Sequence, residues 1–170
     1  MFSVGDLVVY PAQGVGKIES IAQKNIGELA CDFYIVCILS NNITLMVPVD
    51  NARNVGLRSL VSFANASAIL DSFNDHSLFS CHTGQNWNRR YREYTERLKS
   101  NTLESVAHVL HELLLISQGK ELSFGERRLL EQAMLLVAGE LAVVLDKPES
   151  EIRNTVQNIF VPPLPEENCA

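Results

Sequence analysis

The spacing of hydrophobic residues in this 170-residue chain changes near residue 60, and this change limits the possible folds most strongly. Before it, short runs rich in β-branched and aromatic residues are separated by Pro, Gly and Asn turn signals. The expected strands are 7–10, 15–21, 33–39 and 43–49, and the second of them alternates with one slip in its pattern. Four or five short strands of this kind suggest a small SH3- or Tudor-like β-barrel, closed by a turn at 51–56.

After residue 60 the apolar residues recur at helical spacing, as Leu129, Ala133, Leu136 and Val137 do. Five helices are expected, at 63–74, 86–99, 103–117, 123–145 and 148–159.

Start and stop signals support these helices. Ser123 and Glu126 have the spacing of a capping box, Gly119 fits a helix end, and Pro148 fits the start of the last helix. The sequence therefore predicts an α+β protein of two domains, with a small β-barrel over 1–60 and an all-α bundle of about five helices over 61–160. The Pro-rich, acidic segment 161–170 is expected to be a flexible tail.

No catalytic, nucleotide-binding or metal-binding motif is complete. The stretch GVGK at 14–17 lacks the spacing and the following helix of a phosphate-binding loop, and a tight β turn explains its glycines better. The stretch HVLHE at 108–112 has the wrong spacing for a zinc-protease helix and is expected to be a solvated helix face. His76, Cys81 and His82 form only a loose cluster. We expect no enzymatic activity, no cofactor and no metal.

Composition and cysteine usage indicate a cytoplasmic protein. The contents of 46% hydrophobic and 20% charged residues are typical of a soluble globular chain. No apolar run approaches the roughly 20 residues of a membrane span, and the start lacks the pattern of an export signal. Because no CxxC pair is present, the cysteines are expected to be ordinary thiols: Cys31, Cys37, Cys81 and Cys169.

The segment QNWNRRYREY at 85–94 stands out in a chain whose formal net charge is −6. It holds the only Trp, and residues 86–99 carry five basic side chains against two acidic ones. On a helix, Trp87, Tyr91, Tyr94 and Leu98 form one stripe, which is expected to be core for the last three. Trp87 lies in the first turn, where it can project outward to insert at a distorted base step beside phosphate-binding arginines. The alternative is a protein–protein adaptor with Trp87 buried and no DNA contact.

Four stretches resemble one known family. VGDLVVYPAQGVGKIESI, MVPVDNARNVGLRSLVS, NWNRRYREYTERLKS and ELSFGERRLLEQA are similar to segments of the CarD/CdnL family of bacterial RNA-polymerase-binding transcription regulators. The resemblance covers residues 1 to about 160. It implies a Tudor-like domain that binds the polymerase β subunit and a helical domain that meets promoter DNA at the upstream edge of the melted bubble. It also implies a longer-lived open complex, no small-molecule substrate, no membrane partner, and association with the nucleoid through polymerase.

The resemblance also implies roles for individual residues. Trp87 matches a wedge that enters the minor groove at the upstream fork. On the polymerase side, Lys24 lies where some members have an Arg, and Met46 is apolar as in the CdnL-like branch. Pro48 is the third residue expected to contact polymerase, and Ile116 replaces a basic residue of some relatives. The residues expected to bind DNA beside the wedge are Arg89, Arg90, Arg92, Arg127 and Arg128, of which Arg89 and Arg90 have a structural role as an alternative.

Overall fold

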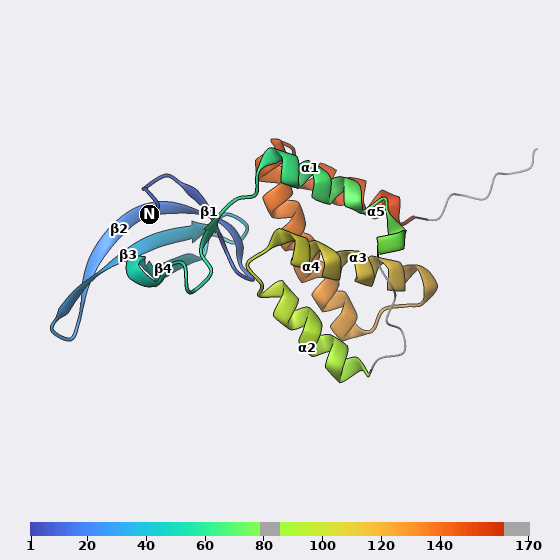
Figure 1. Cartoon of the computed structure of the whole chain (residues 1–170), viewed down its shortest axis with the longest axis horizontal. Coiled ribbons are helices and arrows are strands. Elements are labelled where there is room, and N and C mark those ends of the chain that lie inside the picture. The colour runs from blue at the N-terminus through green and yellow to red at the C-terminus, as the bar shows by residue number, and fades with distance from the viewer. Residues whose placement is uncertain (79–85, 162–170) are drawn as a thin grey trace, which may run out of the picture.

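A computed structural model of the chain describes residues 1–78 and 86–161. Figure 1 shows an elongated molecule, with an antiparallel sheet at one end and a group of helices at the other. The predicted tail at 161–170 lies outside the described residues except for its first residue, and so do Cys81, His82 and Cys169.

The N-terminal half forms a sheet of five strands in the order β4-β3-β2-β1-β5, and every pair is antiparallel. The predicted fold class is confirmed, although the sheet is open and does not close into the expected barrel. β4 and β5 lie at opposite edges of the sheet, since β4 pairs with β3 and the two-residue β5 pairs with β1. The strands are β1 (Leu7–Tyr10), β2 (Gly14–Ile26), β3 (Leu29–Ile38), β4 (Thr44–Pro48) and β5 (Arg58–Ser59).

The hairpin of β2 and β3 is longer than the sequence pattern predicts. Its outer part projects away from the helices (Figure 1), and most of its side chains there are exposed. Only the inner part of each strand has buried side chains. The hydrophobic pattern detects this part and misses the exposed outer part. The slip in the pattern at 15–21 corresponds to a bulge, where the register with β3 shifts between Ile18 and Ser20.

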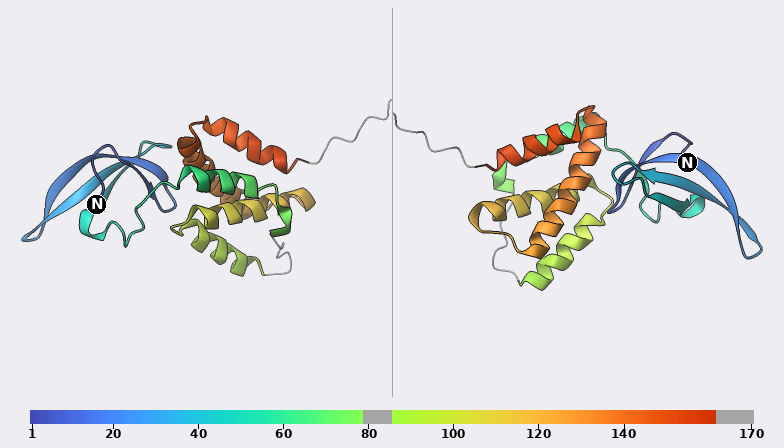
Figure 2. Two further views of the ribbon diagram at one scale, coloured as in Figure 1. Left: turned by 45° about the horizontal axis from the view of Figure 1, so that its top comes forward. Right: turned by 180° about the vertical axis from the view of Figure 1, so that it is seen from behind.

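The C-terminal half contains the five predicted helices, with ends within two residues of the expected ones. α4 begins with the predicted capping box, in which the Ser123 hydroxyl accepts from the amide of Glu126 at 3.3 Å and the Glu126 carboxylate accepts from the amide of Ser123 at 2.9 Å. α4 packs against each of the other four helices and also against β2; Figure 2 shows it crossing the domain. The helices are α1 (Phe63–Ser72), α2 (Trp87–Leu98), α3 (Leu103–Gly119), α4 (Phe124–Leu145) and α5 (Glu149–Ile159), with short 3₁₀ turns at Val49–Asn51 and His76–Leu78.

A partly buried ion pair ties the two halves together. The Arg58 guanidinium, from β5, donates to both oxygens of Glu140 in α4 at 2.7 and 2.8 Å. The amide of Val61, in the connection to α1, donates to the same carboxylate at 3.0 Å, and the Glu140 side chain is only 2% exposed. A bidentate pair restricts orientation as well as distance. The contact therefore fixes how the sheet is placed on the helices.

The expected solvated face at 108–112 is wrong. His111 is 1% exposed and packs against both Phe73 and Phe160, with ring centroids 5.5 and 5.0 Å away. Glu112 is also buried and lies 3.4 Å from the Nδ1 atom of His108. α3 packs against both α2 and α4, and the residues that follow α1 and α5 cover His111. Helical spacing within one segment does not reveal this enclosure.

Among the described residues, no helix combines the length and the apolar character needed to cross a membrane.

Candidate nucleic-acid interface

The buried face of α2 is centred on a different stripe from the predicted one. Tyr94 and Leu98 are 4% and 2% exposed, as expected for core residues. Tyr91 is 44% exposed, so its prediction as core is wrong. The third buried residue of the helix is Arg90, which lies four residues before Tyr94. The helix is therefore rotated so that an arginine takes the place in the core that the aromatic pattern assigns to Tyr91.

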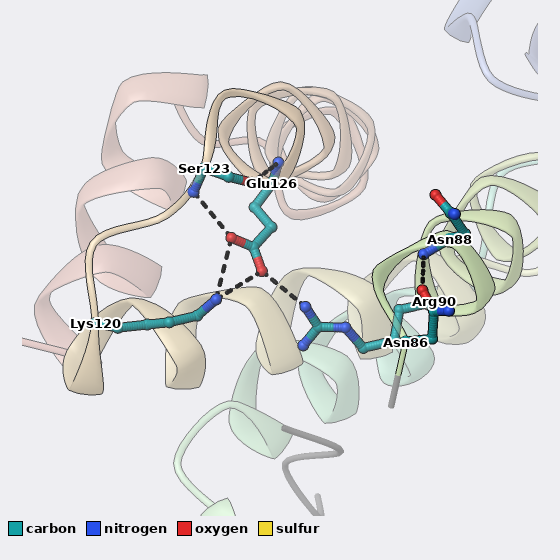
Figure 3. Close-up of polar contacts among 6 residues, drawn as sticks. All are labelled: Asn86, Asn88, Arg90, Lys120, Ser123 and Glu126. Carbon is teal, nitrogen blue, oxygen red and sulfur yellow. Dashed lines mark hydrogen bonds and ion pairs between the residues drawn. The ribbon is translucent and has the colours of Figure 1, made fainter. Parts of the chain in front are cut away.

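Arg90 is buried because a carboxylate from α4 meets it. Its Nη2 atom donates to Glu126 Oε1 at 3.0 Å, and both side chains are nearly inaccessible. The same carboxylate accepts from Lys120 Nζ and from the amide of Ser123 (Figure 3). Burial raises the pKa of Glu126, but the hydrogen bonds from Ser123 and Lys120 outweigh it and hold the pKa below its usual value of 4.5. Arg90 thus serves as a structural link between α2 and the start of α4 and is not accessible to phosphate.

The ring of Trp87 lies against Gly125 in the first turn of α4. A Cβ atom at position 125 would stand 2.8 Å from Cζ2 of the indole, so only glycine leaves room for the ring in this position. The Arg90 guanidinium lies 5.6 Å from the indole centroid, and the Tyr91 ring lies at the same centroid distance on the neighbouring turn. Trp87 is half-buried, so its ring is held in one place while part of it stays accessible.

Two of the predicted DNA-binding arginines, Arg92 in α2 and Arg128 in α4, are exposed and carry no ion pair within 1–78 and 86–161. Lys99, the C-cap residue that follows α2, is exposed as well and comes about two helical turns after Arg92. Their charges are available to an anionic ligand.

Arg89 and Arg127 are also exposed, but each has a neighbouring partner. Arg89 is paired with Glu93 one turn later, at 3.2 Å. Arg127 donates to the carbonyl oxygen of Leu122 at 3.0 Å and to the carboxylate of Glu121 at 2.7 Å. Exposed pairs of this kind contribute about 0–1 kcal/mol, so a phosphate can compete for either arginine.

The three residues expected to contact polymerase lie close together in the sheet. Lys24 Nζ, from β2, is 3.5 Å from Sδ of Met46 in β4. Met46 is 43% exposed, and Pro48 ends the same strand. β4 is an edge strand, so its outer main-chain groups are free of strand partners within the sheet.

Sequence reasoning missed Phe124, the first residue of α4. It is 83% exposed, although a Phe next to a capping box is easily taken for core. A signal was present, because Phe124 is out of phase with the stripe of Leu129, Ala133 and Leu136 that α4 buries.

Within the part of the chain that the structure describes, no three His, Cys, Asp or Glu side chains gather in a way that would hold a metal ion.

Each half of the chain matches the model of a known protein family. Residues 2–61 match the family model of the CarD-like/TRCF RID domain, and residues 69–157 match that of the CarD C-terminal domain. A Bacillus subtilis (strain 168) protein described as "Putative transcription factor YdeB" is 27% identical over 158 residues, which cover 91% of this chain and 99% of that protein. The fold and the two matches place the protein in the class of transcription regulators. The chain belongs to the CarD/CdnL family.

Proposed function

We propose that this regulator binds the β subunit of RNA polymerase through residues 1–60 and stabilises the promoter open complex through residues 61–160. Trp87 acts as a wedge in the minor groove at the upstream edge of the melted region, and Arg89, Arg92, Arg127 and Arg128 hold the DNA backbone. The observation that carries the proposal is the position of Trp87, held against Gly125 with part of its ring exposed and the Arg90 guanidinium 5.6 Å from its centroid. The proposed role is non-enzymatic and is carried out in the cytoplasm, on polymerase at the nucleoid.

The wedge favours the open complex for a simple energetic reason. Separating stacked base pairs costs a few kcal/mol, and the cost is lowest where the duplex is already opening. A side chain that fills the gap therefore interacts better with melted DNA than with closed DNA, and a ligand shifts an equilibrium only by such a difference. Because Gly125 and Arg90 hold the indole before DNA arrives, little ordering of the ring is required on binding.

The acidic character of the protein makes a second contact necessary. A net charge of −6 and four available arginines give weak binding to DNA alone. Once the protein is attached to polymerase, its contact with DNA is intramolecular, and the effective concentration of the DNA near the helical half is raised. In this proposal Met46, Lys24 and Pro48 supply that attachment from the β4 side of the sheet. The fixed connection between Arg58 and Glu140 then sets the distance from the attachment site to the wedge.

A binding measurement with the isolated β subunit tests the attachment. Met46→Asp places a charge in the exposed apolar position and is expected to weaken binding at least tenfold. Phe63→Asp is the matched control, because Phe63 is also exposed, at 65%, but lies in α1. Equal affinity of the wild type and Met46→Asp would refute attachment through β4.

The arginines are tested by the salt dependence of DNA binding. Replacing Arg92 or Arg128 with Ala should weaken binding similarly for all sequences and lower the salt slope by about one for each phosphate that the protein no longer neutralises. An unchanged slope would exclude the phosphate role of the arginine that was replaced.

A further inference from the structure

A groove of about 370 Å³ lies between α2 and the first turns of α4. Its volume is within the range of small-ligand sites, roughly 300–1,000 Å³. Tyr91 and Phe124 contribute aromatic rings, Lys99 and Arg128 contribute positive charges, and Gln132 contributes an amide. Tyr91 also contacts Trp87. Gly125, against which the Trp87 ring lies, lines the groove as well. The groove therefore adjoins the proposed wedge.

Exposed aromatic rings are the first sign that this groove has a ligand. Phe124 is 83% exposed and Tyr91 is 44% exposed, so two large rings that line the groove are open to solvent. The start of α4 does not depend on Phe124, because the Ser123 and Glu126 capping box holds it. Contiguous exposed apolar surface in a soluble protein commonly marks a binding site.

The charge of the groove indicates which kind of ligand fits. Its described lining holds two cations and no carboxylate, although acidic side chains outnumber basic ones by 20 to 14 in the whole chain. Lys99 and Arg128 have no ion pair within the described residues. By contrast, the groove between α1 and α3 contains the carboxylate of Glu104 and neither Lys nor Arg. The combination of flat rings with free cations suits a planar, anionic ligand.

We propose that this groove binds an unpaired nucleobase of single-stranded DNA. The base stacks on Phe124 and Tyr91, the amide of Gln132 contacts the edge of the base, and Lys99 and Arg128 hold the flanking phosphates. This inference rests on the proposed function, because a wedge at Trp87 frees a base next to the groove. The wedge then opens the step, and the groove keeps one of the separated bases from pairing again.

A double-mutant cycle tests the groove in the complete polymerase complex: the protein and the DNA template are changed separately and then together. Open-complex lifetime is measured on templates in which single nucleotides at the upstream edge of the bubble are replaced, one by one, by abasic sites. With wild-type protein, one abasic position is expected to shorten the lifetime about 5- to 150-fold, the range for one stacked base. Phe124→Ala should shorten the lifetime to a similar degree on the intact template, and the abasic site should then add little.

Three variants make the result specific. Phe124→Tyr keeps an aromatic ring and should retain the wild-type lifetime, whereas Phe124→Leu keeps apolar area without a stacking face and should not. Phe63→Ala is the matched control, since Phe63 is also the first residue of a helix that follows a Ser cap and is also exposed. It should behave as wild type on every template.

The outcomes separate this inference from the function on which it rests. If Trp87→Ala shortens the lifetime while Phe124→Ala does not, the groove does not hold a base, but the proposed role of Trp87 as a wedge is supported. The same conclusion follows if the effect of every abasic site is equal for wild type and Phe124→Ala. If wild-type protein itself does not lengthen the lifetime, both the proposed function and the base site are refuted.

Discussion

Replacing Gly125 with Ala separates the placement of Trp87 from the stability of the protein. The new methyl carbon would stand 2.8 Å from Cζ2 of the indole, whereas carbon atoms in good contact are about 3.5–4.0 Å apart. The ring must therefore move by about 1 Å or tilt away from α4. Gly125 lies within α4 and has no positive φ, so the backbone accepts Ala without strain.

The expected change in stability is small. Ala is favoured over Gly within a helix by about 0.5–1 kcal/mol, and crowding a packed site costs about 1–3 kcal/mol. Trp87 is half-buried and can yield toward solvent, so the cost should lie at the lower end and the two effects should nearly cancel. The open-complex lifetime, by contrast, should fall toward that of Trp87→Ala, because the wedge no longer points in its original direction.

Three measurements on one variant test this reasoning. Urea denaturation gives the stability, the fluorescence of Trp87 reports the ring because it is the only Trp, and dissociation of the open complex gives the lifetime. Gly139→Ala is the matched control, since it lies in the same helix and its Cβ would meet nothing within 4 Å. A Gly125→Ala protein with altered fluorescence and wild-type lifetime would refute the idea that the position of the ring matters.

Three further predictions concern the buried charged and titratable groups. Arg58→Ala leaves the buried Glu140 carboxylate without its cation and should cost about 3–5 kcal/mol in urea denaturation, whereas replacing both residues with Met should recover most of the loss. Glu126→Gln should likewise cost about 3 kcal/mol, while Glu121→Gln, which breaks an exposed pair, should cost less than about 1 kcal/mol; equal losses would contradict the role of burial. Burial and the neighbouring histidines lower the pKa of His111 to about 4 from its usual 6.5, so the unfolded chain binds a proton in this interval and the folded protein does not. Stability should therefore be full above pH 6.5 and fall between pH 6.5 and 4, by at most about 1.4 kcal/mol per pH unit, and His111→Gln should flatten this dependence in denaturation curves recorded across that range.

Much of the fold is predictable because its signals are local. The helices follow from apolar spacing, and the capping box of Ser123 and Glu126 lies within four consecutive residues. The strands follow from β-branched runs between turns. Closure of the sheet is not predictable in this way, because it depends on whether two edge strands, far apart in sequence, meet each other.

The same distinction between local signals and contacts of distant residues applies to the candidate site. A basic, aromatic segment around Trp87 is visible in the sequence, but which side of α2 is buried depends on Glu126, 36 residues after Arg90. For that reason the sequence wrongly predicts Tyr91 in the core and leaves Arg90 open between a DNA-binding and a structural role, whereas the structure exposes Tyr91 and buries Arg90. The role of Gly125 is likewise a contact between two helices, and no local pattern indicates it.

The lifetime of the promoter open complex with Trp87→Ala tests the central claim most directly. The variant should bind the polymerase β subunit with wild-type affinity, because Trp87 lies in α2 and the proposed attachment lies in the sheet. We predict that wild-type protein lengthens the lifetime and that Trp87→Ala loses most of this effect. A Trp87→Ala protein that binds polymerase normally and stabilises the open complex as well as wild type would contradict the account.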